Sequence, residues 1–409
     1  MKKRIIQAFI TFIIFHIIPA LAQQKQAPST GLFTSCLKIV PTSVKTVSVN
    51  TDSVVVRRIT FTSRKGVNTI YGIIASPAAP GKYPALLVMH GGGSYADELE
   101  GFIRKYAAQG YVAMAVDEPG ICNPGKAKLS EGAWRNRPKE PDSRFDIAQS
   151  VDSSTLVDAV TAGLGAFNLL ENEVNVDRNY IGITGFSWGG YMTTMLSGLL
   201  GNRVKAAYAV FGCGFYEKGS NWKDLLGTMP EKERMAWLAN FDAGRKAPGI
   251  KCPYFIEASV NDKYFWPEAV MATLNAVNAP KNLVWGPNLD HVRLNAGERM
   301  QQLYFDYYLK QQGQPFGKVN IIKTRTINRG SDILVNVTMP KNIRTNSVTL
   351  YYGKKNAARA TKKWTPVIAV QVSAHTYKVK LPEGIQAAGV DYYLIATDNR
   401  KIKTATYIQ

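Results

Sequence analysis

The chain has 409 residues, with 50 lysines and arginines against 30 acidic residues and only four cysteines. This length predicts two domains, and 45% hydrophobic with 20% charged residues excludes a disordered or fibrous protein. Four cysteines are too few for a disulfide-built scaffold, while a net charge of +20 leaves nucleic acid, acidic glycans and anionic membrane surfaces open as partners.

The first 22 residues have the features of a cleaved export signal. Basic residues at positions 2–4 precede an apolar run over residues 5–21, and Ala20 and Ala22 place small side chains where a signal peptidase reads them. Polar residues and a proline interrupt the run, so it is a poor membrane span. We therefore expect a signal peptide over residues 1–22, an exported (periplasmic or extracellular) protein, no stable membrane insertion and no nucleic-acid partner.

Alternating strand and helix patterns follow as far as residue 311. The predicted strands are residues 54–62, 68–75, 84–89, 111–117, 179–184, 206–211, 253–259 and 281–285. The predicted helices are residues 97–109, 153–172, 188–200, 266–277 and 294–311. Strands that alternate with helices indicate the α/β class, with a doubly wound and mostly parallel sheet covered by helices on both faces.

From about residue 318 the pattern changes to short β-type runs separated by turns. These runs are residues 318–326, 331–338, 347–352, 365–372, 376–381, 389–397 and 403–408. Seven strands in about 90 residues fit a small all-β sandwich of immunoglobulin or fibronectin type. We therefore expect a catalytic domain over residues 23–316 and a β-sandwich accessory domain over residues 317–409, with a linker at residues 311–315.

A candidate nucleophile lies between a predicted strand and a predicted helix. Residues 185–189 read Gly-Phe-Ser-Trp-Gly, which matches the G-x-S-x-G pattern of a nucleophile elbow. Such a turn forces the serine into a strained backbone conformation, and the flanking glycines relieve the crowding. Ser187 is therefore the predicted nucleophile, and the alternative is an ordinary strand-to-helix turn with an inert serine.

A serine hydroxyl needs a general base, which in a hydrolase of this topology follows later in the chain, after an acid. Asp262 and His291 come after two later predicted strands, in that order. Asp290 competes as the acid, but it adjoins the histidine in sequence and is badly placed to brace the imidazole from behind. The predicted catalytic residues are therefore Ser187, Asp262 and His291.

The oxyanion of a tetrahedral intermediate needs preorganised hydrogen-bond donors. One predicted donor is the backbone N–H of Trp188, at the head of the helix that follows the serine. The other is the N–H of Gly91 or Gly92, in the glycine turn after the third predicted strand, where a backbone amide can approach substrate closely. We expect His90 to shape this turn rather than to transfer protons.

Two insertions fall beyond the carboxyl ends of predicted strands, where ligands bind in α/β sheets. They span residues 121–152 and 213–250, and the second contains Tyr216, Trp222 and Trp237. These three aromatic residues are the candidate substrate-binding residues. The alternative is that they pack the core of a small helical cap.

The cysteines and histidines do not have the spacing of a metal site. The three histidines beyond the signal segment are scattered, so we expect no metal and no cofactor. Cys213 and Cys252 flank neighbouring parallel strands at opposite ends of the sheet, which excludes a disulfide between them. Pairing among Cys36, Cys122 and Cys213 stays open.

With the strand-placed elbow and the Ser–Asp–His order, residues 54–312 resemble an α/β-hydrolase of the acetyl xylan esterase and dienelactone hydrolase-like branch. The phrase GFSWGGY is also similar to the elbow of the prolyl oligopeptidase family. Dienelactone hydrolases carry a cysteine where this chain has Ser187. The resemblance implies a serine hydrolase that cleaves carboxylic esters through an acyl-enzyme, acting on an acetyl or similar ester of a carbohydrate.

Two other functions remain as alternatives. A serine peptidase of prolyl oligopeptidase type would need acidic residues to bind a free amino terminus, and Asp117 and Glu118 are the candidates. A non-catalytic glycan-binding protein on a hydrolase scaffold would use the β-sandwich as its working part, but the complete triad order argues against it.

Most of the basic excess lies in residues 317–409, where 16 lysines and arginines face four acidic residues, a net charge of +12. Five cations cluster in one predicted loop ahead of Trp364. They are Lys354, Lys355, Arg359, Lys362 and Lys363. The simplest interpretation is a solvated basic face, and the functional alternative is a surface that binds acidic polysaccharide or a membrane surface.

Overall fold

The computed structural model describes residues 31–41, 44–50, 53–138, 142–327 and 330–409. The expected signal peptide, residues 1–22, lies outside these ranges. Within them, no helix is long and apolar enough to cross a bilayer.

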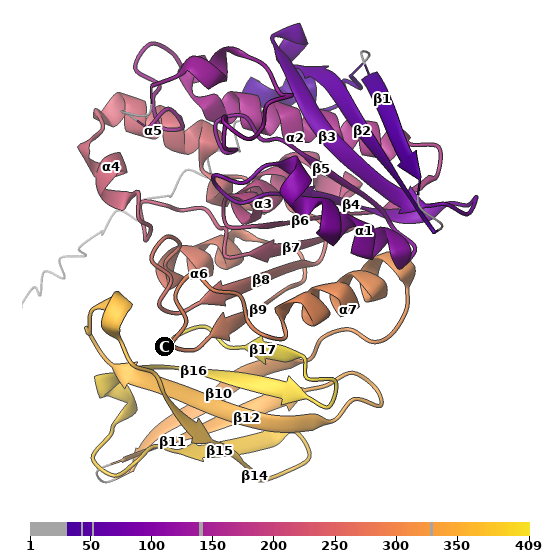
Figure 1. Cartoon of the computed structure of the whole chain (residues 1–409). Helices are drawn as coiled ribbons and strands as arrows, with labels where there is room; N and C mark the ends of the chain where they lie inside the picture. Colours follow the sequence, from indigo (N-terminus) through magenta and orange to yellow (C-terminus); the bar gives the residue numbers. More distant parts are fainter. Residues whose placement is uncertain (1–30, 42–43, 51–52, 139–141, 328–329) are drawn as a thin grey trace, which may run out of the picture.

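A nine-stranded mixed sheet forms the larger part of the molecule (Figure 1). Its strands are β1 (Val44–Asn50), β2 (Val54–Ser63), β3 (Asn68–Pro77), β4 (Tyr83–Met89), β5 (Val112–Val116), β6 (Val176–Phe186), β7 (Ala206–Val210), β8 (Tyr254–Ser259) and β9 (Lys281–Gly286). The order is β1-β2-β3-β5-β4-β6-β7-β8-β9, parallel from β5 to β9 and antiparallel from β1 to β5. The predicted α/β fold class is confirmed, and β1 is an added edge strand that the pattern did not predict.

Helices cover both faces of this sheet. α1 (Glu100–Ala108) and α7 (Gly297–Lys310) lie on one face, while α2 (Thr155–Asn172), α3 (Trp188–Leu200) and α6 (Pro267–Ala276) lie on the other. An ion pair between Lys105 and Glu298, at 2.9 Å, joins the two helices of the first face. The side chain of Ser154 accepts a hydrogen bond from the Leu156 amide and so caps the N-terminus of α2. This helix is buried on nearly every side, because its sequence is apolar all round.

The sheet order creates a crevice at the carboxyl end of the central strand. The chain runs from β4 to β5 on one side of β4 and then returns to β6 on the other side. The loops after β4 and β6 therefore leave the sheet next to each other, at the point where ligands bind in doubly wound folds. The insertion before β8 adds α4 (Lys223–Thr228) and α5 (Glu231–Phe241).

The C-terminal part is the predicted all-β sandwich of two four-stranded sheets. One sheet contains β10 (Lys318–Ile327), β11 (Gly330–Thr338), β15 (Thr376–Lys380) and β14 (Val370–Gln371). The other contains β13 (Thr365–Ile368), β12 (Thr345–Lys354), β16 (Val390–Asp398) and β17 (Lys403–Ala405). Their facing side chains, such as Val335 and Leu394, form a shared core. The run predicted as one strand over residues 365–372 divides at Ala369, because the chain there crosses from one sheet to the other.

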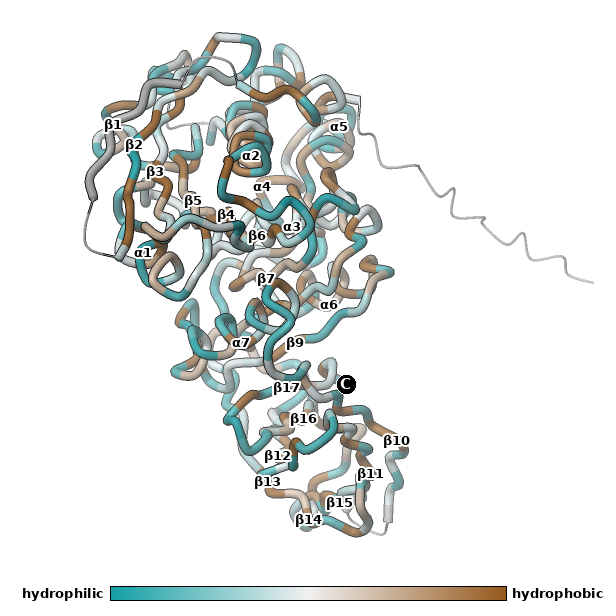
Figure 2. The backbone as a smooth tube through the Cα atoms, turned by 90° about the vertical axis from the view of Figure 1, so that its right-hand side faces the viewer, coloured by the Kyte–Doolittle hydropathy of each residue, from teal (hydrophilic) through white to brown (hydrophobic). Residues whose placement is uncertain are grey.

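The second of these sheets packs against the β9 edge of the large sheet (Figure 2). Trp285 of β9 is fully buried, and its indole N–H donates to the Thr406 carbonyl at 2.9 Å. The Tyr393 ring packs against both Trp285 and Trp364, with ring centroids 6.3 and 5.0 Å apart. The hydrophobic core of the α/β part therefore continues into the sandwich.

All four cysteines lie in the described ranges, and all are unpaired. The pairing left open among Cys36, Cys122 and Cys213 is therefore not made in this structure. Burial raises the pKa of the Cys122 and Cys213 thiols, so both are held in the protonated form.

Candidate active site

Ser187 occupies a sharp turn between β6 and α3. Its φ of +58° lies in the left-handed region, which is strained for a residue with a side chain. A Cβ at Gly189 would lie 2.1 Å from the Met89 carbonyl oxygen, and one at Gly185 would lie 2.4 Å from the Gly189 carbonyl oxygen. The flanking glycines are therefore required by close backbone contact, and the Ser187 amide bonds to the Val210 carbonyl at 2.9 Å.

Asp262 and His291 meet beyond the ends of β8 and β9. The Asp262 side chain is fully buried, and its Oδ2 lies 2.8 Å from His291 Nδ1. Its Oδ1 accepts hydrogen bonds from the amides of Tyr264, at 2.7 Å, and Phe265, at 3.1 Å. These bonds orient the carboxylate, and an ionised carboxylate at this distance places the proton of the neutral imidazole on Nδ1.

Asp290 is turned away from this pair. It accepts a hydrogen bond from the Lys263 amide at 2.9 Å and forms an ion pair with the Lys263 side chain at 3.1 Å. Its side chain is 46% exposed, whereas that of Asp262 is 0% exposed. The geometry therefore brings together the acid and the histidine that the sequence favoured.

Aromatic rings surround the His291 imidazole. The ring centroids of Phe186, Phe211, Tyr264 and Phe265 lie 5.4, 4.5, 5.0 and 6.0 Å from that of His291. The Nε2 atom is buried and has no hydrogen-bond partner among the described residues. Since Phe186 directly precedes the serine, its ring contact places the imidazole beside the elbow, with Nε2 free of other hydrogen bonds to the described residues.

Ser187 and His291 line one cavity of about 1040 Å³. Its other walls are formed by the glycine turn, the first insertion, and residues of the second insertion and of the Asp262 loop. Among them are Gly91, Gly92, Asn123, Arg144, Trp188, Asn221, Trp222 and Tyr264. Polar and aromatic side chains therefore line the same cavity as Ser187 and His291.

The predicted oxyanion donors lie next to the serine. A Cβ at Gly91 would lie 3.6 Å from Ser187 Cβ, and one at Gly92 would lie 2.8 Å from Trp188 Cδ1. The Gly93 amide donates to Ile121 at 2.8 Å, whereas the amides of Gly91, Gly92 and Trp188 have no partner within the described ranges. These three amides remain the candidates for binding a developing negative charge.

His90 is fully buried and fixes the glycine turn. Its Nδ1 lies 2.8 Å from the Gly91 carbonyl, and its Nε2 accepts a hydrogen bond from the Glu118 amide at 3.0 Å. The His90 amide donates in return to Glu118 Oε1 at 2.6 Å. Burial lowers the pKa of His90 to about 4, so the imidazole is neutral near pH 7 and acts as a structural bridge.

The two acids considered for an amino-terminus site are also buried. Asp117 accepts hydrogen bonds from the Ala96 amide, at 2.8 Å, and the Ser130 hydroxyl, at 2.7 Å. Burial raises the pKa of both Asp117 and Glu118. Neither carboxylate lines the Ser187 cavity, and both hold the backbone behind it.

The three candidate substrate-binding aromatic residues occupy different depths. Trp222 lines the cavity, whereas Tyr216 and Trp237 are fully buried behind it. Tyr216 packs on Trp222 and on Trp237, with ring centroids 5.3 and 6.0 Å apart. Tyr216 and Trp237 therefore support the wall, as the helical-cap alternative expected, while Trp222 faces the cavity.

Arg144 is a cavity residue that the sequence did not single out. Its guanidinium lies 4.4 Å from the centroid of the Trp188 ring and pairs with Asp142 through bonds of 2.9 and 2.6 Å. The Trp237 indole N–H donates to the Arg144 carbonyl at 2.9 Å, which joins the two insertions. The polar character of the first insertion was the signal for such a wall residue.

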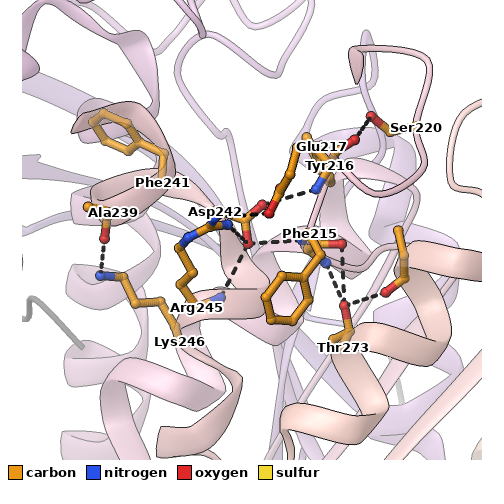
Figure 3. Close-up of polar contacts among 12 residues, drawn as sticks. Phe215, Tyr216, Glu217, Ser220, Ala239, Phe241, Asp242, Arg245, Lys246 and Thr273 are labelled. Atoms are coloured by element: carbon orange, nitrogen blue, oxygen red, sulfur yellow. Dashed lines mark hydrogen bonds and ion pairs between the residues drawn. The ribbon is translucent and has the colours of Figure 1, made fainter. Parts of the chain in front are cut away.

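A buried acid ties the second insertion to the body of the protein (Figure 3). Asp242 accepts hydrogen bonds from the amides of Phe215, at 2.9 Å, Tyr216, at 3.1 Å, and Arg245, at 3.2 Å. On the other side, the Gly214 amide donates to Thr273 Oγ1 of α6 at 2.9 Å. These bonds hold in place the segment that leads to the Trp222 wall.

The five clustered cations do not all face solvent, which corrects the expectation of one basic face in this loop. Arg359 points toward the Asp262 loop and donates to main-chain carbonyls there. Lys362 is nearly buried and pairs with Asp391. The others are exposed, namely Lys354, Lys355 and Lys363.

In the described part of the chain, no cluster of three or more His, Cys, Asp or Glu side chains could hold a metal ion.

Comparison with known sequences adds a family match over this site. The profile of the Dienelactone hydrolase family matches residues 70–304. The acetyl esterase Axe7A of Xylanibacter ruminicola is 24% identical over 259 residues, which cover 59% of this chain and 57% of that protein. The uncharacterized peptidase YtmA of Bacillus subtilis is 27% identical over 188 residues, covering 43% and 63%. The match spans less than two thirds of the length of either relative.

Solved structures have the same fold. Acetyl xylan esterase 1 from Thermoanaerobacterium sp. superposes with a TM-score of 0.57 at 19% identity, over 68% of this chain and 92% of that one. The acetyl xylan esterase from Paenibacillus sp. R4 gives a TM-score of 0.55 at 21% identity, over 67% and 92%.

Proposed function

Because this chain belongs to the dienelactone hydrolase family, we propose that it is a serine esterase that removes acetyl or similar acyl groups from a carbohydrate. The observation that carries the proposal is the 2.8 Å bond between Asp262 and His291, whose imidazole lines the same cavity as the strained Ser187. A nucleophile, a base and an acid that orients the base are the groups that acyl transfer requires.

In the first half of the proposed reaction, Ser187 Oγ attacks the ester carbonyl carbon and gives its proton to His291 Nε2. The resulting oxyanion accepts hydrogen bonds from the Trp188 amide and from Gly91 or Gly92. The carbon–oxygen bond to the alcohol then breaks, and His291 returns the proton to the departing alcohol. Asp262 holds the Nδ1 proton and stabilises the imidazolium between these steps.

In the second half, water attacks the acyl-enzyme. His291 Nε2 takes a proton from the water as the water oxygen bonds to the acyl carbon. The oxyanion that results accepts hydrogen bonds from the same backbone amides as before. Collapse of the intermediate releases the carboxylic acid and returns the proton to Ser187. The cycle needs no group beyond this chain, its substrate and water.

The cavity walls support a carbohydrate alcohol. Trp222 and Tyr264 place aromatic side chains in the cavity wall, where a sugar ring can contact them, while Asn123, Asn221 and Arg144 place polar groups there that can bond to hydroxyls. Relatives named as acetyl or acetyl xylan esterases favour the same class of substrate. The peptidase alternative is less well supported, because the candidate acids for an amino terminus are buried away from this cavity.

An activity panel tests the proposal. Nitrophenyl acetate, acetylated xylan and dipeptide anilides would be offered to the purified protein, with acetate or nitroaniline release as the readout. We expect hydrolysis of the two acetyl esters and labelling of Ser187 by a fluorophosphonate. The variants Ser187→Ala and His291→Ala should each lose on the order of 10⁴-fold or more in kcat while keeping native circular dichroism. Cleavage of the dipeptide anilides alone, or a folded His291→Ala protein with near-native turnover, would overturn it.

We also propose that residues 23–316 are the catalytic domain, that residues 317–409 are an accessory domain, and that the protein is exported. The signal-like sequence at the start of the chain supports export. The exposed Lys354, Lys355 and Lys363 could bring the accessory domain to acidic polysaccharide.

A further inference from the structure

The loop between β12 and β13, residues 355–364, lies against the loop that carries Asp262. The Asn261 side-chain amide donates to the main-chain carbonyls of Arg359, at 2.7 Å, and Lys362, at 2.8 Å. In return, the Arg359 guanidinium donates to the main-chain carbonyls of Asn261, at 3.2 Å, and Asp262. Four hydrogen bonds therefore join the sandwich to Asn261 and to Asp262, the candidate acid.

The same loop also meets the segment that leads to His291. The Asn288 side chain donates to the Trp364 carbonyl at 2.9 Å and accepts from the Trp364 amide at 2.7 Å. Asn288 itself has a φ of +56°, in the left-handed region, three residues before the histidine. This reciprocal pair fixes the conformation of the turn from which His291 projects.

These contacts are partly shielded from water, although Asn288 itself is exposed. Trp364 is 4% exposed and Asn261 is 7% exposed, while the Arg359 guanidinium lies 4.6 Å from the centroid of the Trp266 ring. Burial lowers the pKa of Arg359. Hydrogen bonds from a charged donor in such surroundings are stronger than exposed neutral ones, so they can restrain a loop.

Asp262 is consequently held from two sides. Its carboxylate bonds to His291 and to two amides of its own loop, and its main-chain carbonyl accepts from Arg359. A shift of this carbonyl would move the carboxylate, and a displacement of about 1 Å within a catalytic group can cost on the order of 10²-fold in rate.

We propose that Arg359 is a positioning residue for the Ser187–His291–Asp262 triad, and that the loop of residues 355–364 is the part of the β-sandwich that supports catalysis. The loop holds the acid and histidine segments at a fixed separation. This inference rests on the proposed esterase function. The competing view is that these contacts only attach one part of the protein to the other.

The test compares Arg359→Ala with Arg325→Ala in the full-length protein. Arg325 is an exposed arginine on β10 of the same sandwich, so this control removes the same residue type and charge. For Arg359→Ala we expect kcat on nitrophenyl acetate to fall by about 10- to 100-fold with KM changed less than about twofold. The rate of Ser187 phosphonylation should fall by the same factor, and Arg325→Ala should match the wild type in both.

A proton NMR signal separates positioning from mere attachment. The Nδ1 proton that His291 shares with Asp262 should give a low-field resonance in the wild type and in Arg325→Ala. We expect this resonance to broaden or disappear in Arg359→Ala while circular dichroism stays native. Arg359→Lys, which keeps a charged donor, should recover part of the rate and of the signal.

The outcomes distinguish the two proposals. A wild-type protein that neither hydrolyses esters nor reacts with the phosphonate overturns the esterase function itself. An active wild type whose Arg359→Ala variant keeps the same kcat, labelling rate and low-field proton overturns only the positioning role. If Arg359→Ala does not fold, Arg359→Lys carries the test, and a rate equal to that of the wild type then counts against the proposal.

Discussion

Asp262 Oδ2 lies 2.8 Å from His291 Nδ1, although the acid next to the histidine in sequence is Asp290. The backbone bends at Asp290 and His291, and the Asp290 side chain pairs with Lys263 instead of the imidazole. The acid that reaches the imidazole comes from the preceding strand–loop unit, since the carboxyl ends of β8 and β9 lie side by side in the sheet.

We predict that Asp262→Asn lowers kcat for nitrophenyl acetate by on the order of 10⁴-fold, because the amide cannot hold the imidazole in the required tautomer. Asp290→Asn should change kcat by less than about tenfold, since its carboxylate serves a surface ion pair. Steady-state kinetics on both variants, with circular dichroism as a check of folding, decide the matter. A larger loss in Asp290→Asn would mean that the acid is wrongly assigned.

Trp222 and Trp237 should separate binding from stability. Trp237 is fully buried, so Trp237→Ala should lower the free energy of unfolding by about 3–5 kcal/mol in urea titrations. Trp222 faces the cavity, so Trp222→Ala should mainly raise KM for acetylated xylan and leave kcat for nitrophenyl acetate within about threefold. Equal KM values for acetylated xylan in Trp222→Ala and the wild type would remove Trp222 from the substrate site.

His90 should make stability depend on acidity. Burial lowers its pKa to about 4 in the folded protein, against about 6.5 in an unfolded chain. Its contribution to stability is therefore complete above about pH 6.5 and is lost as the pH falls toward 4, because the unfolded chain takes up the proton first. Glu118, whose pKa is raised by burial, acts in the opposite direction, since its proton uptake on acidification favours the folded state.

A His90→Gln variant isolates the histidine, because Glu118 is present in both proteins. Between about pH 7.5 and about pH 5, the wild type should lose about 2 kcal/mol more of its free energy of unfolding than the variant. Urea unfolding at the two pH values measures this difference. Parallel pH profiles would show that folding does not lower the pKa of His90.

The three exposed lysines should make any polysaccharide binding sensitive to salt. We expect retention on a pectin-like uronic-acid polymer to be strong at about 0.1 M salt and lost at about 1 M, as the Debye length falls from about 10 Å to about 3 Å. Replacing Lys354, Lys355 and Lys363 with glutamine should abolish it. Equal retention on neutral and acidic polymers at both salt concentrations would leave these lysines as a solvated face only.

The sequence predicted the sheet and the elbow because both depend on local signals. Strands such as residues 84–89 and 206–211 are buried on both faces and show as unbroken apolar runs, and the glycines at 185 and 189 mark a turn that only small residues fit. Edge strand β1 escaped notice because lysine, threonine and serine alternate with its valines, a pattern that loops share.

Contacts between distant segments could not be predicted in this way. Nothing near Arg359 in the sequence indicates that its guanidinium meets a carbonyl 97 residues earlier in the chain. The burial of Tyr216 and Trp237 likewise depends on how the second insertion folds over α3. Aromatic composition alone does not distinguish residues that line a cavity from residues that pack behind them.

The indole of Trp285, buried beneath Tyr393 and bonded to Thr406, has a consequence for how the protein unfolds. Separating the sandwich from the large sheet would expose that ring together with Trp364 and would break the buried hydrogen bonds around both. The free energy needed to separate the two parts is therefore close to that needed to unfold one of them. The two parts should unfold in a single cooperative transition rather than one after the other.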